Sequence, residues 1–128
     1  MVDCNKVRDY KDLEVWNKSM DLVADVYKVV KSFPQEEQYS LVSQIKRSAV
    51  SIPSNISEGA SRKSKKEILQ FLYIALGSAS ELETQLLISK RLGYSTNLDN
   101  LLSEITVIRK MLNSLPSSLK RKILDTNK

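Results

Sequence analysis

Apolar side chains recur along most of the chain at alternating intervals of three and four residues, which is the spacing of one face of an α-helix. Four such stripes occur, separated by residues that favour helix ends. Their members are Leu13, Trp16, Met20, Val23, Tyr27 and Val30; Leu41, Ile45, Ala49, Ile52 and Ile56; Ile68, Leu72, Ala75, Ala79, Leu82 and Leu86; and Leu98, Leu101, Ile105, Ile108, Leu112 and Leu115. The pattern predicts four helices and an all-α fold.

Local signals indicate where these helices begin and end. Ser64 and Glu67 form a capping-box pattern at the start of the third helix, in which each side chain satisfies a backbone N–H. Gly59 is the expected stop of the second helix, and Gly93 that of the third. Pro116 is expected to close the fourth helix, because proline lacks the N–H that would continue it.

The stripes repeat about every 3.5 residues, which is typical of left-handed bundles. Because the predicted connections are short, successive helices should be antiparallel, in an up-down-up-down four-helix bundle. We therefore divide the chain into an N-terminal arm over residues 1–11, the bundle over residues 12–115 and a basic C-terminal tail over residues 116–128.

Residues 68–76, ILQFLYIAL, are apolar on nearly every side of the third helix. A bundle buries one stripe of each helix, so a segment that is apolar all round needs a second surface to cover it. We expect another copy of the chain to provide that surface, in a homo-oligomer. The predicted interface residues are Ile68, Phe71, Leu72, Ile74 and Ala75.

The net charge of +5 is concentrated in two segments, residues 46–66 and residues 108–128. In the antiparallel bundle these segments and the N-terminal arm meet at one pole, which would attract phosphate backbones. A solubilising surface with a loose tail is the alternative. The cations predicted at this pole are Lys6, Arg8, Lys11, Arg62, Lys63, Lys65, Lys66, Arg109, Lys110, Lys120, Arg121 and Lys122.

Catalytic constellations are missing from the sequence. The chain has no histidine, which excludes Ser-His and Cys-His triads and the Glu-x-x-His di-iron pattern of bundles. No Gly-rich phosphate loop occurs. We predict a protein without enzymatic activity, cofactor or metal. Glu81 and Glu83 are expected to pair with Arg47 and Arg109 on neighbouring helices, with a metal or acid–base role as the alternative.

The beginning of the chain and its cysteine content bear on location. The first residues are charged and do not resemble a signal peptide, and no uncharged stretch is long enough for a membrane span. Cys4, the single cysteine, allows no internal disulfide and fits a reducing cytoplasm. We predict a cytoplasmic protein with no membrane partner.

Most of the chain, residues 10–115, resembles the bacterial four-helix-bundle proteins encoded in intervening sequences of the large-subunit rRNA gene. The similarity is carried by YKDLEVWNKSMDLV, FPQEEQYSLVSQIKRSAVSIPSNISEG and SRKSKKEILQFLYIALGSASELETQL. The family usually has Ala where this chain has Ser57. The resemblance implies a cytoplasmic, ring-shaped homopentamer without established enzymatic activity. It also implies kinship with the accessory protein of diversity-generating retroelements, a basic pentamer that binds nucleic acid and a reverse transcriptase.

The most specific part of the resemblance, SIPSNISEG, contains a motif of unknown role made by Asn55, Glu58 and Gly59. Pro53 inside this helix leaves the carbonyl of Ala49 without its usual partner. We expect Asn55 to be buried and to bond to such freed carbonyls. A ligand-contacting role for Asn55 and Glu58 is the alternative.

Two functions remain open. The favoured one is an oligomeric bundle that binds nucleic acid, RNA rather than DNA, through its basic pole. The other is a scaffold for an acidic protein partner, including an accessory role to a nucleic-acid enzyme. The candidate nucleic-acid-binding residues are Arg62, Lys63, Lys65, Lys66, Arg109, Lys110, Lys120, Arg121 and Lys122.

Overall fold

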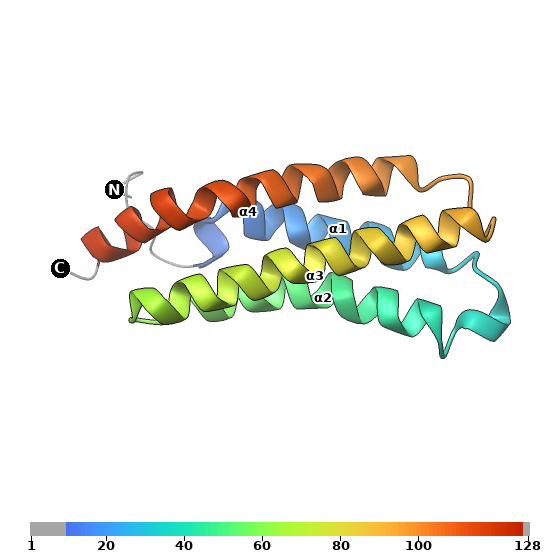
Figure 1. Ribbon diagram of the computed structural model, residues 1–128, viewed down its shortest axis with the longest axis horizontal. Helices are drawn as coiled ribbons and strands as arrows, with labels where there is room; N and C mark the ends of the chain where they lie inside the picture. The colour runs from blue at the N-terminus through green and yellow to red at the C-terminus, as the bar shows by residue number, and fades with distance from the viewer. Residues whose placement is uncertain (1–9, 127–128) are drawn as a thin grey trace.

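The computed structural model describes residues 10–126, and within them the side chains of residues 10–11 and 13–115. It contains four long helices, shown in Figure 1. They are α1 (Glu14–Val30), α2 (Leu41–Ala60), α3 (Lys65–Arg91) and α4 (Asp99–Thr126), with short 3-10 helices η1 (Tyr10–Asp12) and η2 (Gln35–Glu37). Residues 10–126 include no strand, so the prediction of an all-α fold with four helices is confirmed.

The four helices lie side by side, and successive helices run in opposite directions (Figure 1). The α2–α3 turn, the start of α1 and the end of α4 lie at one end of the bundle. We call it the basic end, after Lys63, Lys65 and Lys66 in and after that turn. The α1–α2 and α3–α4 connections lie at the opposite end, here called the loop end.

The core runs along the bundle axis and consists of the apolar stripes of all four helices. The predicted stripes of α2, α3 and α4 are confirmed, with only Leu41 and Leu115 at their ends half-buried. The fully buried large side chains include Ile45, Ile52, Ile56, Leu72, Leu82, Leu86, Leu101 and Ile105. Burial of these side chains is the main stabilising contribution, about 1.5–3 kcal/mol for each.

The predicted stripe of α1 is partly wrong. Met20 and Tyr27 are 45% and 39% exposed, whereas the core face carries Val15, Leu22 and Val26. The helix has two apolar stripes side by side, and the buried one contains a polar residue, Ser19. The Ser19 hydroxyl donates to the carbonyl of Trp16 at 2.8 Å, and this bond satisfies the buried hydroxyl. Periodicity alone could not choose between the two stripes.

One predicted helix end is wrong, and another is met to within one residue. Helix α4 continues through Pro116 to Thr126, so the boundary expected at residue 115 does not divide a helix from a tail. Proline removes one hydrogen bond, but the following residues, such as Leu119 and Lys120, favour helix and continue it. Helix α2 ends at Ala60, one residue after the predicted stop at Gly59.

Gly93, in contrast, ends α3 as predicted. Its φ of 74° lies in the left-handed region that glycine adopts without strain. The N–H of Gly93 donates to the carbonyl of Lys90, and that of Tyr94 to the carbonyl of Ser89. This is the Schellman pattern, which satisfies the last carbonyls of a helix. Within residues 10–126, no helix is long and apolar enough to cross a membrane.

Candidate nucleic-acid interface

The α2–α3 turn at the basic end is short and defined by its own hydrogen bonds. The N–H of Ser61 contacts the carbonyls of Ser57 and Glu58, and the N–H of Arg62 donates to the carbonyl of Gly59. Helix α3 then begins with the Ser64 hydroxyl accepting from the N–H of Glu67 at 3.3 Å. One half of the predicted capping box is therefore present, while the Glu67 carboxylate has a different partner.

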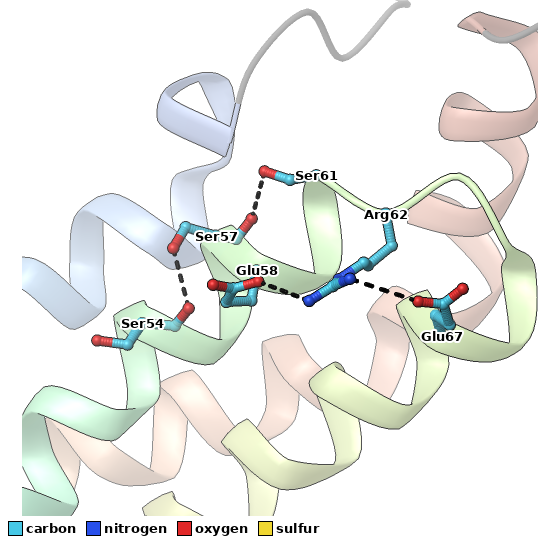
Figure 2. Close-up of polar contacts among 6 residues, drawn as sticks. All are labelled: Ser54, Ser57, Glu58, Ser61, Arg62 and Glu67. Atoms are coloured by element: carbon cyan, nitrogen blue, oxygen red, sulfur yellow. Dashed lines mark hydrogen bonds and ion pairs between the residues drawn. The ribbon is translucent and has the colours of Figure 1, made fainter.

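That partner is Arg62, whose guanidinium lies between two carboxylates (Figure 2). Nη2 is 3.1 Å from Glu58 Oε2, and Nη1 is 3.6 Å from Glu67 Oε2. The same guanidinium lies over the Phe71 ring, with its carbon 4.9 Å from the ring centroid. Arg62 thus joins the last turn of α2 to the first two turns of α3. Its charge is compensated inside the turn, which reduces what it can offer to a phosphate.

Lys63, Lys65 and Lys66 differ from Arg62 in this respect. All three are exposed, and none forms an ion pair or a hydrogen bond with another described side chain. They also lie at the N-terminus of α3, where the unpaired backbone N–H groups carry partial positive charge. The basic end therefore presents three uncompensated cations beside a helix N-terminus.

The other predicted cations do not all lie with these lysines. Arg109 pairs with Glu83 at 3.1 Å, as predicted for an ion pair. However, Glu83 is eighteen residues beyond Lys65, about 27 Å along α3, so Arg109 and its neighbour Lys110 lie near mid-bundle. Their placement at the pole was wrong because α4 extends past Pro116. Lys120, Arg121 and Lys122 belong to that extension, but their side chains lie outside the described residues, as do Lys6 and Arg8 entirely.

The predicted oligomer-interface residues divide into two groups. Ile68, Leu72 and Ala75 are buried in the core of the single chain. Phe71 is half-buried beneath Arg62, and Ile74 is 44% exposed. Part of the apolar segment is therefore exposed to solvent in the single chain. This follows from its apolar residues lying on every side of the helix, since the core covers one side only. Sequence reasoning missed Tyr73, which is 58% exposed and lies farther from the core stripe than its neighbours.

The motif residues Asn55, Glu58 and Gly59 have local structural partners. The Asn55 amide is half-buried and donates to the carbonyl and hydroxyl oxygens of Ser51 at 2.8 and 2.9 Å, not to the carbonyl of Ala49. The Ser51 hydroxyl is in turn bonded to that of Ser78 on α3 at 2.8 Å. Asn55 thereby orders a polar contact between α2 and α3.

Gly59 is a point of close helix packing. A Cβ atom there would lie 3.0 Å from Phe71 Cβ and 3.2 Å from the carbonyl oxygen of Ile68. A side chain at position 59 would require Phe71 or the backbone at Ile68 to shift by a few tenths of an ångström, because α2 and α3 approach each other closely there. Gly59 was expected to stop a helix, and its actual role is to let two helices touch.

Two carboxylates have surroundings that the sequence did not predict. Glu81 accepts a hydrogen bond from the Ser48 hydroxyl at 2.7 Å. The predicted ion pair between Glu81 and Arg47 is not formed, although Glu81 and Arg47 line the same open groove. On the α1–α4 side, burial raises the pKa of Glu104 to about 7, helped by a hydrogen bond with Asp25 and by the charges of Asp25 and Asp21. No metal-binding cluster of His, Cys, Asp or Glu occurs among the described residues.

The fold and this surface define the class of the protein: an all-α bundle with uncompensated cations gathered at one end. A family model described as 23S rRNA-intervening sequence protein matches residues 11–114. The chain therefore belongs to the 23S rRNA-intervening sequence protein family, and the resemblance stated from its sequence is confirmed.

A solved structure supports the same assignment. It is a protein of unknown function from the S23 ribosomal protein family of Bacteroides thetaiotaomicron. The two chains share 30% identity and superpose with a TM-score of 0.74, over 80% of this chain and 94% of the other. The search among curated proteins found no match. Kinship with the accessory protein of diversity-generating retroelements stays a prediction.

Proposed function

We propose that the protein is a non-enzymatic, oligomeric helical bundle that binds nucleic acid at its basic end, with structured RNA as the favoured ligand. The observation that carries this proposal is the set of uncompensated amines of Lys63, Lys65 and Lys66. Phosphate contacts by lysines supply most of the affinity of non-specific nucleic-acid binding.

Their position argues against a purely stabilising role. Cations at a helix N-terminus oppose the helix dipole, at about 0.3–1 kcal/mol each when exposed. Lys65 and Lys66 occupy the first turn of α3, where a phosphate would instead meet lysine charge and unpaired backbone N–H groups together. The lysine charges therefore lower the stability of the fold slightly, and they would strengthen the binding of an anionic ligand.

RNA is favoured over DNA on the grounds of shape. Double-stranded RNA is recognised mostly through its phosphates and 2′-hydroxyls, without reading base edges. Flexible lysine side chains at the end of a bundle suit such contacts. Because phosphate contacts carry no sequence information, we expect little sequence preference from the three lysines.

Self-association is the second part of the proposal. The outward side of α3 exposes Tyr73, Ile74, Leu87 and Ile88, each by 44% or more. A ring of identical subunits would cover some of this surface and bring the basic ends to one face. We propose five copies, following the resemblance to ring-shaped homopentamers, in the cytoplasm.

The assembly is tested by Ile74→Glu, because a charge at a subunit contact opposes burial. The variant should have a smaller molar mass by light scattering and unchanged helicity by circular dichroism. Val107→Glu on α4 is the matched control, since Val107 is also 44% exposed. A wild-type protein that is monomeric at micromolar concentration would contradict the proposed oligomer.

Binding is tested by a salt titration of the wild-type protein with a structured RNA. The logarithm of the binding constant should fall linearly with the logarithm of salt concentration, at about 0.7–0.9 per phosphate contact. Absence of RNA binding at about 50 mM salt, where such contacts are strong, would reject the proposal. The protein would then be better explained as a scaffold for an acidic protein partner.

A further inference from the structure

Tyr73 is an exposed aromatic residue close to the lysines of the basic end. It lines an open groove on α3 together with Lys66, Leu69, Gln70 and Ile74. The residue is 58% exposed, and its ring makes no aromatic or cation–π contact within the described residues. Its hydroxyl likewise makes no hydrogen bond to a described residue. The fold itself therefore does not account for this side chain.

The other aromatic residues show that Tyr73 is unusual. Tyr10, Trp16, Tyr27, Phe33, Phe71 and Tyr94 each have a ring or cation partner. Among the described aromatics, only Tyr39 shares with Tyr73 the lack of such a partner. Tyr39 lies at the loop end, two residues after Glu37 and at the opposite end of the bundle from Lys63, Lys65 and Lys66.

We propose that the Tyr73 groove is a stacking site for an unpaired nucleobase, so that the ligand of the basic end includes a single-stranded segment. This inference rests on the proposed nucleic-acid function and narrows its ligand class. Proteins bind single strands by combining a positively charged groove for the backbone with aromatic rings for the bases, because every base has a π-face that can stack.

The spacing along α3 suits this ligand. Lys66 precedes Tyr73 by two helical turns, about 10 Å, and Gln70 lies between them. A base stacked on Tyr73 would leave its flanking phosphates toward Lys66 and the other lysines of the turn. The Gln70 amide, which is exposed in the same groove, has both donors and an acceptor for a base edge or a 2′-hydroxyl.

A subunit contact through Ile74 does not exclude this role. Adjacent residues of a helix point about 100° apart, so Tyr73 and Ile74 lie on opposite flanks of the outward side of α3. Ile74 faces the α2 flank, on the same side as Ser78, which bonds to Ser51. A neighbouring subunit on the α2 flank would cover the Tyr73 groove at Ile74 and leave the part lined by Lys66 and Leu69 open to a nucleotide.

The experiment compares Tyr73→Ala, Tyr73→Phe and the control Tyr39→Ala in binding a labelled oligouridine and a blunt RNA duplex. Tyr73→Ala should weaken oligouridine binding by about 5- to 20-fold, at the lower end of the range for one stacked base. Tyr73→Phe and Tyr39→Ala should stay within about 2-fold of wild type, because the first keeps a ring that can stack and the second lies at the loop end. Duplex binding and the salt slope should be unchanged, since no charge is removed.

Three results would overturn the inference. Equal oligouridine binding by wild type and Tyr73→Ala, with the salt-dependent binding of wild type intact, rejects the stacking site but leaves the proposed function standing. A smaller oligomer in Tyr73→Ala by light scattering assigns Tyr73 to a subunit contact. Absence of binding to either RNA by wild type rejects both proposals together. Because Tyr73 is exposed, the variants should melt like wild type, and circular dichroism checks this.

Discussion

The two ends of the bundle are built differently. At the loop end, contacts tie the two connections together: the Tyr94 hydroxyl donates to Glu37 at 2.5 Å, and the Tyr94 and Phe33 rings are 5.7 Å apart. Lys90 is paired with Asp99 at 3.2 Å. At the basic end, Arg62 closes a single turn, and the neighbouring lysines have no ion-pair partner among the described side chains.

The charged residues at the loop end stabilise the fold, whereas the lysines at the basic end do not. At the loop end, a cation near the C-terminus of α3 is paired with an acid at the start of α4, as helix dipoles favour. The basic end places lysines at a helix N-terminus, where they are locally unfavourable. Stability explains the first arrangement and not the second, which is why we propose a ligand site at the basic end.

The largest effect is expected from removing the uncompensated charges. Replacing Lys63, Lys65 and Lys66 together by Gln should weaken RNA binding about 10- to 100-fold at low salt and flatten the salt slope by up to about 2–3. The matched control replaces Lys28, Lys31 and Arg91 near the loop end, which removes the same charge. Fluorescence anisotropy over a salt series measures both. Equal losses in the two triple variants would mean that net charge, and not the basic end, governs binding.

The close approach of α2 and α3 beside the basic turn should be the next most sensitive feature. In Gly59→Ala the added Cβ would crowd Phe71 and the backbone of Ile68, at about 1–3 kcal/mol for overpacking. Gly77→Ala is the control, since its Cβ would meet nothing within 4 Å, and it should add about 0.5–1 kcal/mol. Urea unfolding should give opposite signs for the two variants. A stabilised Gly59→Ala would show that the contact relaxes freely.

The carboxyl pair of Glu104 and Asp25, which lies in the half of the bundle nearer the loop end, should make stability depend on pH. Glu104 has a pKa of about 7 in the fold against an ordinary 4.5, so between these values the folded protein holds a proton that the unfolded chain has lost. Stability should therefore fall as pH rises from about 4.5 through about 7. Glu104→Gln should remove this dependence and exceed wild type above pH 7 by roughly 1 kcal/mol, after allowance for solvent screening. If the melting temperatures of wild type and Glu104→Gln changed in parallel across this pH range, the raised pKa would not belong to Glu104.

The smallest effect is expected at the Arg62 contact. Arg62→Ala should lower the free energy of unfolding by less than about 1 kcal/mol, because the three charged groups are about half exposed. It should weaken RNA binding less than Lys63→Ala does, although both variants remove one charge, because Arg62 is already paired. Measuring stability and binding on the same two variants distinguishes a structural arginine from a phosphate-binding one. A larger binding loss in Arg62→Ala would place Arg62 in the interface.

Much of the fold was predictable because hydrophobic periodicity records how each helix is rotated toward a core. The stripes of α2, α3 and α4 are nearly continuous and single, so their buried faces follow directly. Helix α1 has two adjacent stripes, and its buried one includes Ser19, so the choice depended on packing. Pro116 is a strong stop signal in isolation, yet the helix continues through it.

The sequence by itself determined the all-α class, the family, three of the four core faces and the charge-rich segments around residues 62–66. Tertiary structure decided which cations share a surface. Arg109 pairs with Glu83, which lies about 27 Å along α3 from Lys65, so Arg109 is far from the basic end. It also decided which charges are compensated: Arg62 meets Glu58 and Glu67 only after the turn closes. Periodicity reports angles about one helix axis, whereas pairing and exposure depend on distances between helices.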